Sequence, residues 1–316
     1  MKVQKARVDI VTSALNEELC IAELTSRLEQ VFQNEPLYSY RITIIDNGSS
    51  DSTWSEITKL AKKSKNIRGI RMSRTFSFDS ALTCGMDFAD ADYLIIMASD
   101  LQDPPEVIHD LLREIEKGFD QVVVHVGKRE YVPFVRRFLS SIFYKFNYWA
   151  TDGLVPKNVS DYRIMSRRLY LSVQKLRENH RFMRGLSAWA GFKTSSVTIV
   201  RPNRFAGESK WLGINFFEVL STAIRATFAF SIKPLLIVSF TSFLLGIISF
   251  MSLIPMSLLF LINGVPFGGF GTLIGFAVLS FGTLMTAFGV IALYISLIYE
   301  ETKQRPLYII QETIAC

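Results

Sequence analysis

The sequence lacks charged residues over one long stretch. From Pro234 to Tyr299, a run of 66 residues, it contains no Asp, Glu, Lys or Arg. Because a membrane-spanning helix needs roughly 20 apolar residues, this run predicts two spans, near 235–262 and 272–299, with a break at the Gly- and Pro-containing residues 263–271. The alternative is a pair of buried helices in a soluble core, but such helices seldom run so far without a charged face.

Cationic residues are missing from the loop between the two expected spans, whereas Arg225 and Lys233 precede the apolar run and Lys303 and Arg305 follow it. By the positive-inside rule, both flanks are expected in the cytoplasm and the loop outside. The sequence then divides into a cytoplasmic domain at 1–209, a juxtamembrane amphipathic helix at 210–233, two transmembrane helices within 234–299 and a cytoplasmic tail at 300–316.

Cysteine and histidine are scarce, with three residues of each in the chain. Cys20, Cys84 and Cys316 form no CxxC pair and the histidines lie far apart, so neither a disulfide framework nor a zinc site is expected. Walker-type glycine loops and GxSxG elbows are also missing. The formal net charge of +6 suits a surface of anionic lipids once membrane spans are admitted, and we expect no nucleic-acid partner.

The N-terminal half alternates between short β-branched runs and segments with helical spacing of apolar residues. Strands are expected near 8–14, 41–46, 67–73, 92–99 and 119–127, with helices near 16–32, 52–62 and 78–89 between them. This rhythm predicts an α/β fold with a mostly parallel, doubly wound sheet. Ligands of such sheets bind at the carboxyl ends of the strands, and polar clusters follow several of the expected strands.

Two of these polar clusters are partly explained by helix initiation. Asn16 is a good N-cap, and Glu17 and Glu18 would favour the positive end of the helix dipole. In "SDLQDPPE", Asp103 can cap a helix that has Pro104 at its first position. Asp100 and Gln102 of the same segment have no such explanation. Their oxygen atoms suit a hard cation such as Mg²⁺ or Mn²⁺, held together with substrate phosphates.

Three motifs in this order resemble those of a known family: "DLQDPPE", "RFAGESKW" and, after the apolar run, "YEETKQRPLY". Together they resemble the polyprenyl-phosphate glycosyltransferases of glycosyltransferase family 2, which include bactoprenol glucosyltransferases and dolichol-phosphate mannose synthases. The resemblance extends over nearly the whole chain. It implies a GT-A (Rossmann-like) catalytic domain followed by two C-terminal transmembrane helices.

The family resemblance also implies an activity: inverting transfer of a sugar from a UDP-sugar to undecaprenyl (polyprenyl) phosphate, with glucose as the expected sugar. The product would serve cell-surface polysaccharide modification, as in decoration of lipopolysaccharide O-antigen, and would need a flippase and a second transferase. The expected location is the bacterial inner (plasma) membrane, as a multi-pass homo-oligomer with its catalytic domain in the cytoplasm.

Carried over position by position, the resemblance assigns a donor site. The nucleotide-sugar contacts are Thr12, Ala14, Glu17, Asp46, Ser99, Asp100, Arg204 and Lys210. Asp46 matches the acid that bonds the base, although Asn47 stands where the family usually has a second acid. Arg201 is a further candidate for pairing with the diphosphate. For Glu17, a favourable charge in the first helical turn is an equally good explanation.

The expected metal ligands are Asp100 and Gln102. Many family members have Asp-Ala-Asp at this element, whereas this chain reads Ala98-Ser99-Asp100. With the first acid missing, Asp100 carries more of the cation binding, and diphosphate oxygens must complete the shell. Metal affinity is therefore expected to depend on bound nucleotide-sugar.

On the acceptor side, cations after the fifth expected strand would hold a lipid phosphate. The expected contacts are Lys128, Arg129, Arg136, Arg137 and Ser140, in and before an aromatic-rich segment typical of an interfacial helix. Asp161 matches the acid proposed to act as base or to orient the acceptor, and Arg163 could pair with it. Asp79, at the start of an expected helix, is interpreted as a cap.

Other functions remain open on the sequence alone. The sugar could differ, the pair could be GDP-mannose and dolichyl phosphate, or the chain could be a processive synthase, although it has no QxxRW motif. The loss of an acid at Ala98 also allows a degenerate, non-catalytic membrane partner.

Overall fold

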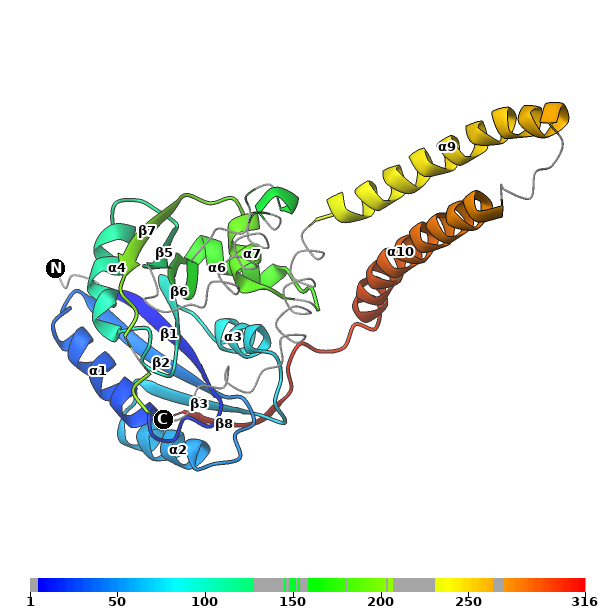
Figure 1. The fold of residues 1–316 in the computed structure, drawn as a ribbon. Helices are drawn as coiled ribbons and strands as arrows, with labels where there is room; N and C mark the ends of the chain where they lie inside the picture. Colours follow the sequence, from blue (N-terminus) through cyan, green and yellow to red (C-terminus); the bar gives the residue numbers. More distant parts are fainter. Residues whose placement is uncertain are drawn as a thin grey trace.

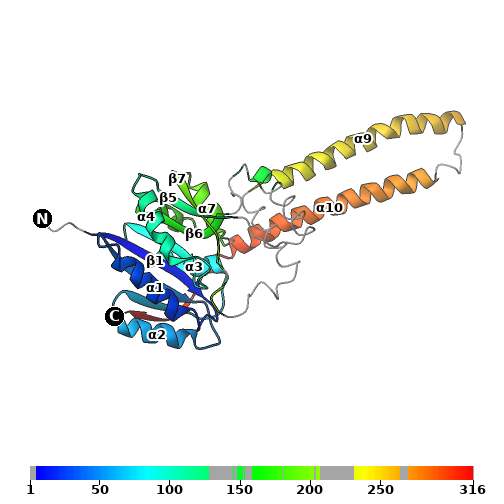
Figure 2. The same ribbon diagram turned by 60° about the vertical axis from the view of Figure 1, so that its left-hand side comes forward.

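The protein is described here by a computed structural model. It describes residues 5–127, 145, 148–151, 153, 159–179, 181–202, 204–206, 231–263 and 270–315. A central sheet, with helices on both faces, forms the globular part, and two long helices extend away from it (Figures 1 and 2).

The sheet has eight strands among the described residues, in the spatial order β7-β5-β6-β4-β1-β2-β3-β8. Their bounds are β1 Ala6–Ala14, β2 Tyr38–Asp46, β3 Ile67–Met72, β4 Tyr93–Ala98, β5 Gln121–Val126, β6 Val159–Ser166, β7 Thr194–Ile199 and β8 Ile310–Ala315. β6 runs antiparallel to β4 and β5, and β8 runs antiparallel to β3, while the other pairs are parallel. The expected α/β fold with a mostly parallel sheet is confirmed.

Helices cover the two faces of the sheet. Their bounds are α1 Ile21–Gln33, α2 Thr53–Lys63, α3 Phe78–Asp87, the 3₁₀ turn η1 Pro105–Val107, α4 Ile108–Ile115, α6 Arg167–Lys175 and α7 Met183–Trp189. Alternate residues of one strand point to opposite faces: Ile10 of β1 packs with α1, α2 and α4, whereas Val11 packs with α3, α6 and α7. The two faces therefore have separate hydrophobic cores.

One glycine sets the distance between a helix and the sheet. A Cβ on Gly85 of α3 would lie 2.3 Å from a methyl carbon of Val11 in β1. Because such a contact is impossible, only glycine lets α3 approach β1 so closely. This approach also fixes where the N-terminal end of α3 lies relative to the carboxyl edge of the sheet.

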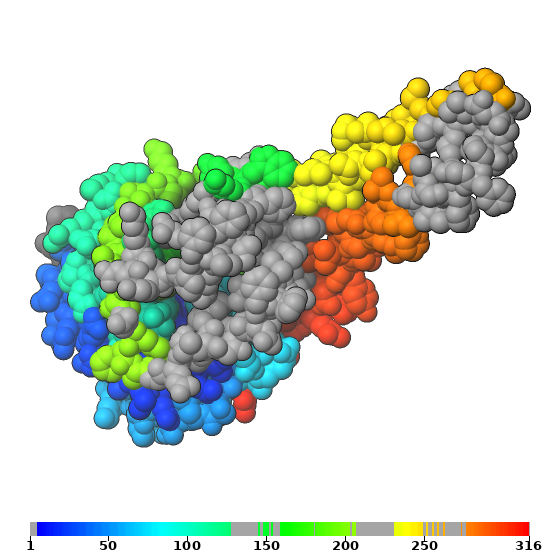
Figure 3. All heavy atoms as spheres, viewed as in Figure 1, coloured from blue at the N-terminus to red at the C-terminus, as the bar shows by residue number. Residues whose placement is uncertain are grey.

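Two long helices follow the domain: α9 Lys233–Asn263, with Pro255 inside it, and α10 Phe270–Thr302. They stand clear of the globular part as a hairpin (Figure 3). Within the described part of the chain, one helical stretch, Phe276–Thr302, is long and apolar enough to cross a membrane, and Lys233–Ile248 is a shorter apolar stretch. One membrane-compatible helix is thus found, and the second span stays a prediction.

The segment after α10 ends in a β-strand and not in a free tail. Ile310–Ala315 forms β8, which pairs with β3 at the sheet edge. Trp54 Nε1 of α2 donates to Glu312 Oε2 at 3.2 Å, and Tyr308 Oη donates to Asp87 Oδ2 of α3 at 2.7 Å. The chain therefore returns from α10 to add an edge strand to the sheet, whereas the sequence predicted only a cytoplasmic tail at 300–316.

Candidate functional site

The carboxyl ends of β1, β2 and β4 meet at one edge of the sheet. In the strand register Ala14 of β1 lies opposite Asp46 of β2, and Ser13 lies opposite Ala98 of β4. Ser99 donates its hydroxyl hydrogen to the Ser13 carbonyl oxygen at 2.9 Å. The structure thus brings together five of the predicted donor residues: Thr12, Ala14, Asp46, Ser99 and Asp100.

Two fully buried oxygen atoms at this edge make no hydrogen bond among the described residues: Thr12 Oγ1 and Asp46 Oδ2. Asp46 Oδ1 accepts from the Ser49 N–H at 3.0 Å, and Asp46 Oδ2 lies 3.3 Å from Arg71 Nε without hydrogen-bond geometry. Buried polar atoms are nearly always paired in native structures. Two buried oxygen atoms without a hydrogen bond from the described part of the chain therefore lie at the edge where the predicted nucleotide-sugar contacts gather.

Asn47, the residue that stands in place of a second acid, joins two loops. Its amide donates to the Phe76 carbonyl oxygen and accepts from the Phe76 N–H, both at 2.9 Å. A carboxylate could accept but could not donate here. The adjacent Gly48 has a φ of +76°, and a Cβ there would lie 2.7 Å from the backbone of Arg74. Asn47 and Gly48 together hold the loop after β3 against the loop after β2.

The start of α1 differs from the sequence prediction. The helix begins at Ile21 with Cys20 as N-cap residue, so Asn16 is not its cap and Glu17 and Glu18 are not in its first turn. Asn16 has a φ of +52°; its N–H donates to Ser49 Oγ at 3.0 Å, and its Oδ1 accepts from the Ser50 N–H at 2.9 Å. Asn16 therefore bonds to the loop after β2 and does not cap α1.

Asp100 lies in a tight turn beyond β4. Its Oδ1 accepts from the Gln102 N–H at 3.1 Å, and Leu101 between them has a φ of +60°. Burial raises the pKa of Asp100, and the nearby Asp103 and Glu17 carboxylates add to the rise, while the Gln102 hydrogen bond opposes it. A carboxylate desolvated in this way gains more than an exposed one when a cation binds beside it.

The residues around Asp100 fit a divalent cation only as a partial shell. Among the residues that the structure describes, no group of three or more His, Cys, Asp or Glu side chains could hold a metal. Asp100 offers hard oxygen atoms, which Mg²⁺ and Mn²⁺ accept. The donor set therefore fits a cation that shares its shell with phosphate oxygens.

Asp103 connects several segments through hydrogen bonds and does not cap a helix. The turn that follows has Pro104 at its N-cap position and no side-chain cap, which corrects the prediction. Asp103 is fully buried: its Oδ2 accepts from the Ala98 N–H at 3.2 Å, and its Oδ1 accepts from Arg201 at 2.6 Å. Arg201 also donates to Ser160 Oγ at 3.1 Å. This network joins the ends of β4, β6 and β7.

The loop after β7 lies over the donor edge, by which we mean the carboxyl ends of β1, β2 and β4, where the predicted nucleotide-sugar contacts gather. Arg204 Nη2 donates to Glu17 Oε1 at 2.5 Å, and the Phe205 N–H donates to the Asp100 carbonyl oxygen at 3.5 Å. The Arg204 side chain is largely buried. Both arginines predicted to meet a diphosphate, Arg201 and Arg204, are thus paired with carboxylates at that edge.

The partner of Asp161 is not the one predicted. Its carboxylate accepts two hydrogen bonds from Arg184 of α7, at 2.7 and 2.5 Å. Arg163 instead donates to the Asp161 carbonyl oxygen at 3.0 Å. Burial would raise the pKa of Asp161, but the charge and hydrogen bonds of Arg184 outweigh it and hold the pKa below its usual value.

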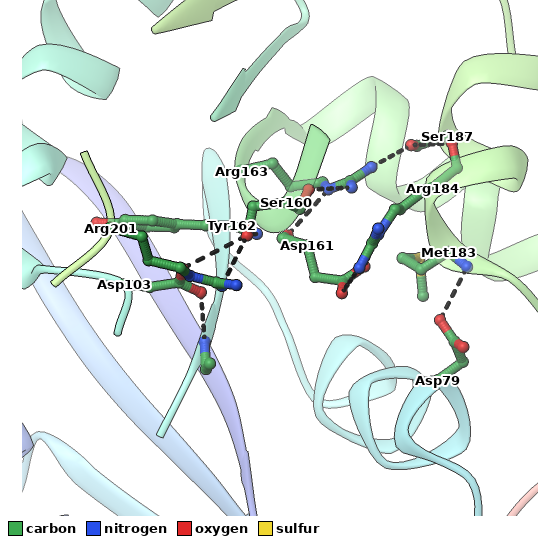
Figure 4. A network of polar contacts seen from close by, with 11 residues as sticks. Asp79, Asp103, Ser160, Asp161, Tyr162, Arg163, Met183, Arg184, Ser187 and Arg201 are labelled. Carbon is green, nitrogen blue, oxygen red and sulfur yellow. Dashed lines mark hydrogen bonds and ion pairs between the residues drawn. The ribbon is translucent and has the colours of Figure 1, made fainter. Parts of the chain in front are cut away.

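Asp79 is also not a cap, because Ser77 accepts from the Ser80 N–H at the start of α3. Asp79 Oδ1 accepts from the Met183 N–H at 2.9 Å. Burial, and next the nearby Asp161 charge, raise the pKa of Asp79 to about 6. Figure 4 shows Asp79, Met183, Arg184 and Asp161 gathered beside the Asp103 network. Nothing in the local sequence indicates that Asp79 and Arg184 meet Asp161.

Several predicted residues lie outside the described ranges. These are Lys128, Arg129, Arg136, Arg137 and Ser140 of the expected acceptor site and Lys210 of the expected donor site. The expected amphipathic helix at 210–233 also lies outside them, except for its last three residues. Gln102 is described, and its backbone N–H contacts Asp100 as stated above.

Comparison with known proteins gives consistent matches. The family model described as Glycosyl transferase family 2 matches residues 9–173. An uncharacterized glycosyltransferase of Synechocystis sp., sll0501, is 33% identical over 309 residues, which cover 96% of this chain and 95% of that protein. The SfII prophage-derived bactoprenol glucosyl transferase of Shigella flexneri is 31% identical over 307 residues, covering 97% and 98%.

Among solved structures, glucosyl-3-phosphoglycerate synthase of Mycobacterium tuberculosis, in complex with Mn²⁺, UDP-glucose and phosphoglyceric acid, aligns with a TM-score of 0.48. The identity is 18%, and the alignment covers 70% of this chain and 80% of that chain. The two sequence relatives, in contrast, match nearly end to end. Their alignments therefore extend well beyond residue 173, where the family model ends.

Proposed function

The chain belongs to glycosyl transferase family 2, and from this premise we propose that it transfers glucose from UDP-glucose to undecaprenyl (polyprenyl) phosphate. The enzyme class follows from the family. The acceptor and the sugar are proposed because the Shigella flexneri relative, similar over nearly its full length, is called a bactoprenol glucosyl transferase. The observation that carries the proposal within this chain is the position of the Asp100 carboxylate, which the Gln102 N–H holds in the turn after β4.

The donor would bind across the carboxyl ends of β1, β2 and β4. Thr12 Oγ1 and Asp46 Oδ2 are buried acceptors with no hydrogen bond among the described residues, and a uracil N–H is a suitable donor for one of them. The diphosphate would then lie toward Asp100, Arg204 and Arg201. The diphosphate oxygens could replace Glu17 as the hydrogen-bond partner of Arg204, because phosphate and carboxylate accept from the same N–H groups of a guanidinium.

A divalent cation, Mg²⁺ or Mn²⁺, would be held by Asp100, with Gln102 beside it and the remaining ligands from the donor's diphosphate. Such an ion supplies charge neutralisation for a departing diphosphate. The protein's own part is to hold the Asp100 carboxylate in one orientation through the Gln102 N–H. The carbonyl of Asp100 is in turn tied to the loop after β7.

In the transfer, an oxygen of the acceptor phosphate forms a bond to the anomeric carbon of the sugar. The bond from that carbon to the β-phosphate oxygen breaks, UDP leaves with the electron pair, and the configuration inverts. A lipid monophosphate is already ionised at neutral pH, so positioning contributes more than proton removal. Asp161, near the start of β6, would lie on this acceptor side.

The membrane part of the proposal rests on the α9–α10 hairpin. Phe276–Thr302 meets the length and composition of a spanning helix, and α9 has 31 residues. We propose that both helices span the bacterial inner membrane, with the catalytic domain in the cytoplasm facing the lipid phosphate. The glucosylated lipid would supply sugar for a cell-surface polysaccharide such as O-antigen. A flippase would first move it across the membrane, and a second transferase would then pass the sugar on.

The test uses the purified full-length protein in detergent with labelled UDP-glucose, UDP-galactose and GDP-mannose and with undecaprenyl phosphate. We expect label in the lipid extract with UDP-glucose and Mg²⁺ or Mn²⁺, and its loss with EDTA. Labelled lipid from another donor would change the sugar but keep the reaction. No labelled lipid with any donor would favour a non-catalytic membrane partner, and long water-soluble polymer would indicate a processive synthase.

A further inference from the structure

The ion pair between Asp161 and Arg184 is a feature that the family assignment does not explain. Its two hydrogen bonds, from Nε and Nη2 of Arg184, have the parallel geometry in which guanidinium and carboxylate bind most strongly. The Arg184 side chain is 37% exposed and that of Asp161 is 20% exposed. The Arg184 side chain is thus the more exposed member of the pair.

The pair lies at the edge of the sheet where the donor residues gather. In the antiparallel pairing of β4 and β6, Ile96 lies opposite Arg163. Two residues further along β4 and two residues back along β6 are Ala98 and Asp161, which are therefore neighbours at that edge. Asp161 is thus next to the segment that leads into Asp100.

Ser160 and Asp161 point to opposite faces of the sheet, as successive strand residues do. Ser160 contacts Arg201 and Asp103 on the face covered by α1 and α4, where Arg204 also pairs with Glu17. Asp161 faces α3 and α7 (Figure 4). Arginine side chains therefore approach this edge from both sides: Arg201 and Arg204 from one, Arg184 from the other.

The position of Arg184 is fixed through α7. The Met183 N–H, next in sequence, donates to Asp79 Oδ1 of α3 at 2.9 Å. At the other end of the same short helix, Ser187 Oγ accepts from Arg163 Nη1 of β6 at 2.5 Å. α7 is thereby tied to α3 and to β6, and these ties together with the Asp161 carboxylate leave the Arg184 guanidinium little freedom.

We propose that Arg184 binds the phosphate of the acceptor and that Asp161 is the positioning residue that presents it. This inference rests on the proposed function, since it takes a lipid phosphate as the acceptor. Two carboxylates, Asp79 and Asp161, would repel an incoming phosphate. A guanidinium held between that phosphate and Asp161 turns the repulsion into attraction. Asp161, kept ionised by Arg184, is a poor proton acceptor, which favours this role over that of a base.

The test compares Michaelis constants for acceptor and donor in the full-length enzyme in detergent, with undecaprenyl phosphate and UDP-glucose. For Arg184→Gln we expect the KM for the lipid phosphate to rise at least tenfold and the KM for UDP-glucose to change less than twofold. Asp161→Asn, which weakens the hold on the guanidinium, should raise the acceptor KM in the same direction. Arg184→Lys keeps the charge and should fall between Arg184→Gln and wild type.

A matched control is Arg177→Gln. Arg177 makes the same two-bonded pair with Asp87, at the other end of α3, and its replacement should leave the acceptor KM unchanged. Thermal unfolding identifies variants that fail to fold. If Arg184→Gln is one of them, the acceptor KM values of Arg184→Lys and Asp161→Asn test the role of Arg184. An unchanged acceptor KM in folded Arg184→Gln overturns the inference. So does an Asp161→Asn enzyme that loses kcat with its acceptor KM unchanged.

The wild-type enzyme and the Arg184→Gln variant together distinguish the role of Arg184 from the transfer reaction itself. If wild-type enzyme glucosylates the lipid phosphate and Arg184→Gln does so with unaltered KM values, the role of Arg184 is wrong and the proposed function stands. If wild-type enzyme transfers sugar to no lipid phosphate, the proposed function itself is wrong.

Discussion

At the scale of single residues, the proposed function assigns activation of the sugar donor to Asp100. We expect Asp100→Ala to lower lipid glucosylation at least a hundredfold, because the cation would lose its one protein carboxylate. The assay is glucosyl-lipid synthesis by purified enzyme in detergent. Asp110→Ala, which removes an exposed carboxylate of α4, is the control. Undiminished synthesis by Asp100→Ala would contradict this role.

The same residue leads to a prediction about metal binding. Since the described residues contain no group of three or more His, Cys, Asp or Glu side chains that could hold a metal, Mn²⁺ should bind weakly to the free enzyme. With UDP-glucose bound, its affinity should rise at least tenfold, as diphosphate oxygens complete the shell. Calorimetric titration of Mn²⁺ with and without UDP-glucose measures this. Equal affinities in the two titrations would show that the protein binds the ion by itself.

Asp79 leads to a prediction about pH. Because its pKa is raised to about 6, the fold favours the protonated form, so the stability that Asp79 contributes is present at low pH and lost as pH rises through about 6. Asn mimics the protonated form and still accepts from the Met183 N–H. Asp79→Asn should therefore be more stable than wild type at pH 7.5, by up to about 3 kcal/mol.

The measurement is thermal unfolding of wild type and Asp79→Asn in detergent at pH 5 and pH 7.5. The difference between the two proteins should shrink at pH 5, where more of the wild-type Asp79 is protonated. The neighbouring Asp161, whose pKa lies below its usual value, stays ionised over this range, and Arg163 and Arg184 stay cationic. A difference that is the same at both pH values would contradict the assignment.

At the scale of elements, β8 is the strand that joins the segment after α10 to the edge of the central sheet. Ile314 packs against the core shared by α1, α2 and α4, whereas Thr313 beside it is exposed. Ile314→Asp should destabilise the domain by about 1–3 kcal/mol, because it buries an unpaired charge. Thr313→Asp, on the opposite face, should have little effect. Equal melting temperatures for the two variants would mean that β8 adds no stability.

At the scale of the whole molecule, the apolar hairpin should place its tip outside the cell and both its ends inside. Asn263 ends α9, and Gln311 lies in β8, where the pairing of that strand with β3 shifts register. In a Cys316→Ala background, where the two remaining cysteines are buried, Asn263→Cys should react with a membrane-impermeant thiol reagent in intact cells. Gln311→Cys should react only after permeabilisation. Labelling of Asn263→Cys that also needs permeabilisation would exclude two spans.

Local sequence was sufficient for most of the fold and for the donor edge. The strands at β1 to β5 and the helices between them were predictable, because β-branched runs and helical spacing are properties of neighbouring residues. Thr12, Asp46 and Asp100 could be placed together, since the carboxyl ends of parallel strands share one edge. The helix starts at Asn16 and Asp103 were predicted wrongly, because these two side chains accept hydrogen bonds from other segments instead of from the first turn of the helix.

The sequence by itself determined that this is an α/β protein with an apolar hairpin and with acids after its parallel strands, because each of these is written in adjacent residues. Only the tertiary structure decided that Asp161 pairs with Arg184, that Asp79 holds the start of α7, and that the last residues form β8. These contacts join residues 23, 104 and roughly 240 positions apart, and no periodicity or local propensity records them. They exist because folding brings the edges of the sheet and the ends of its helices together.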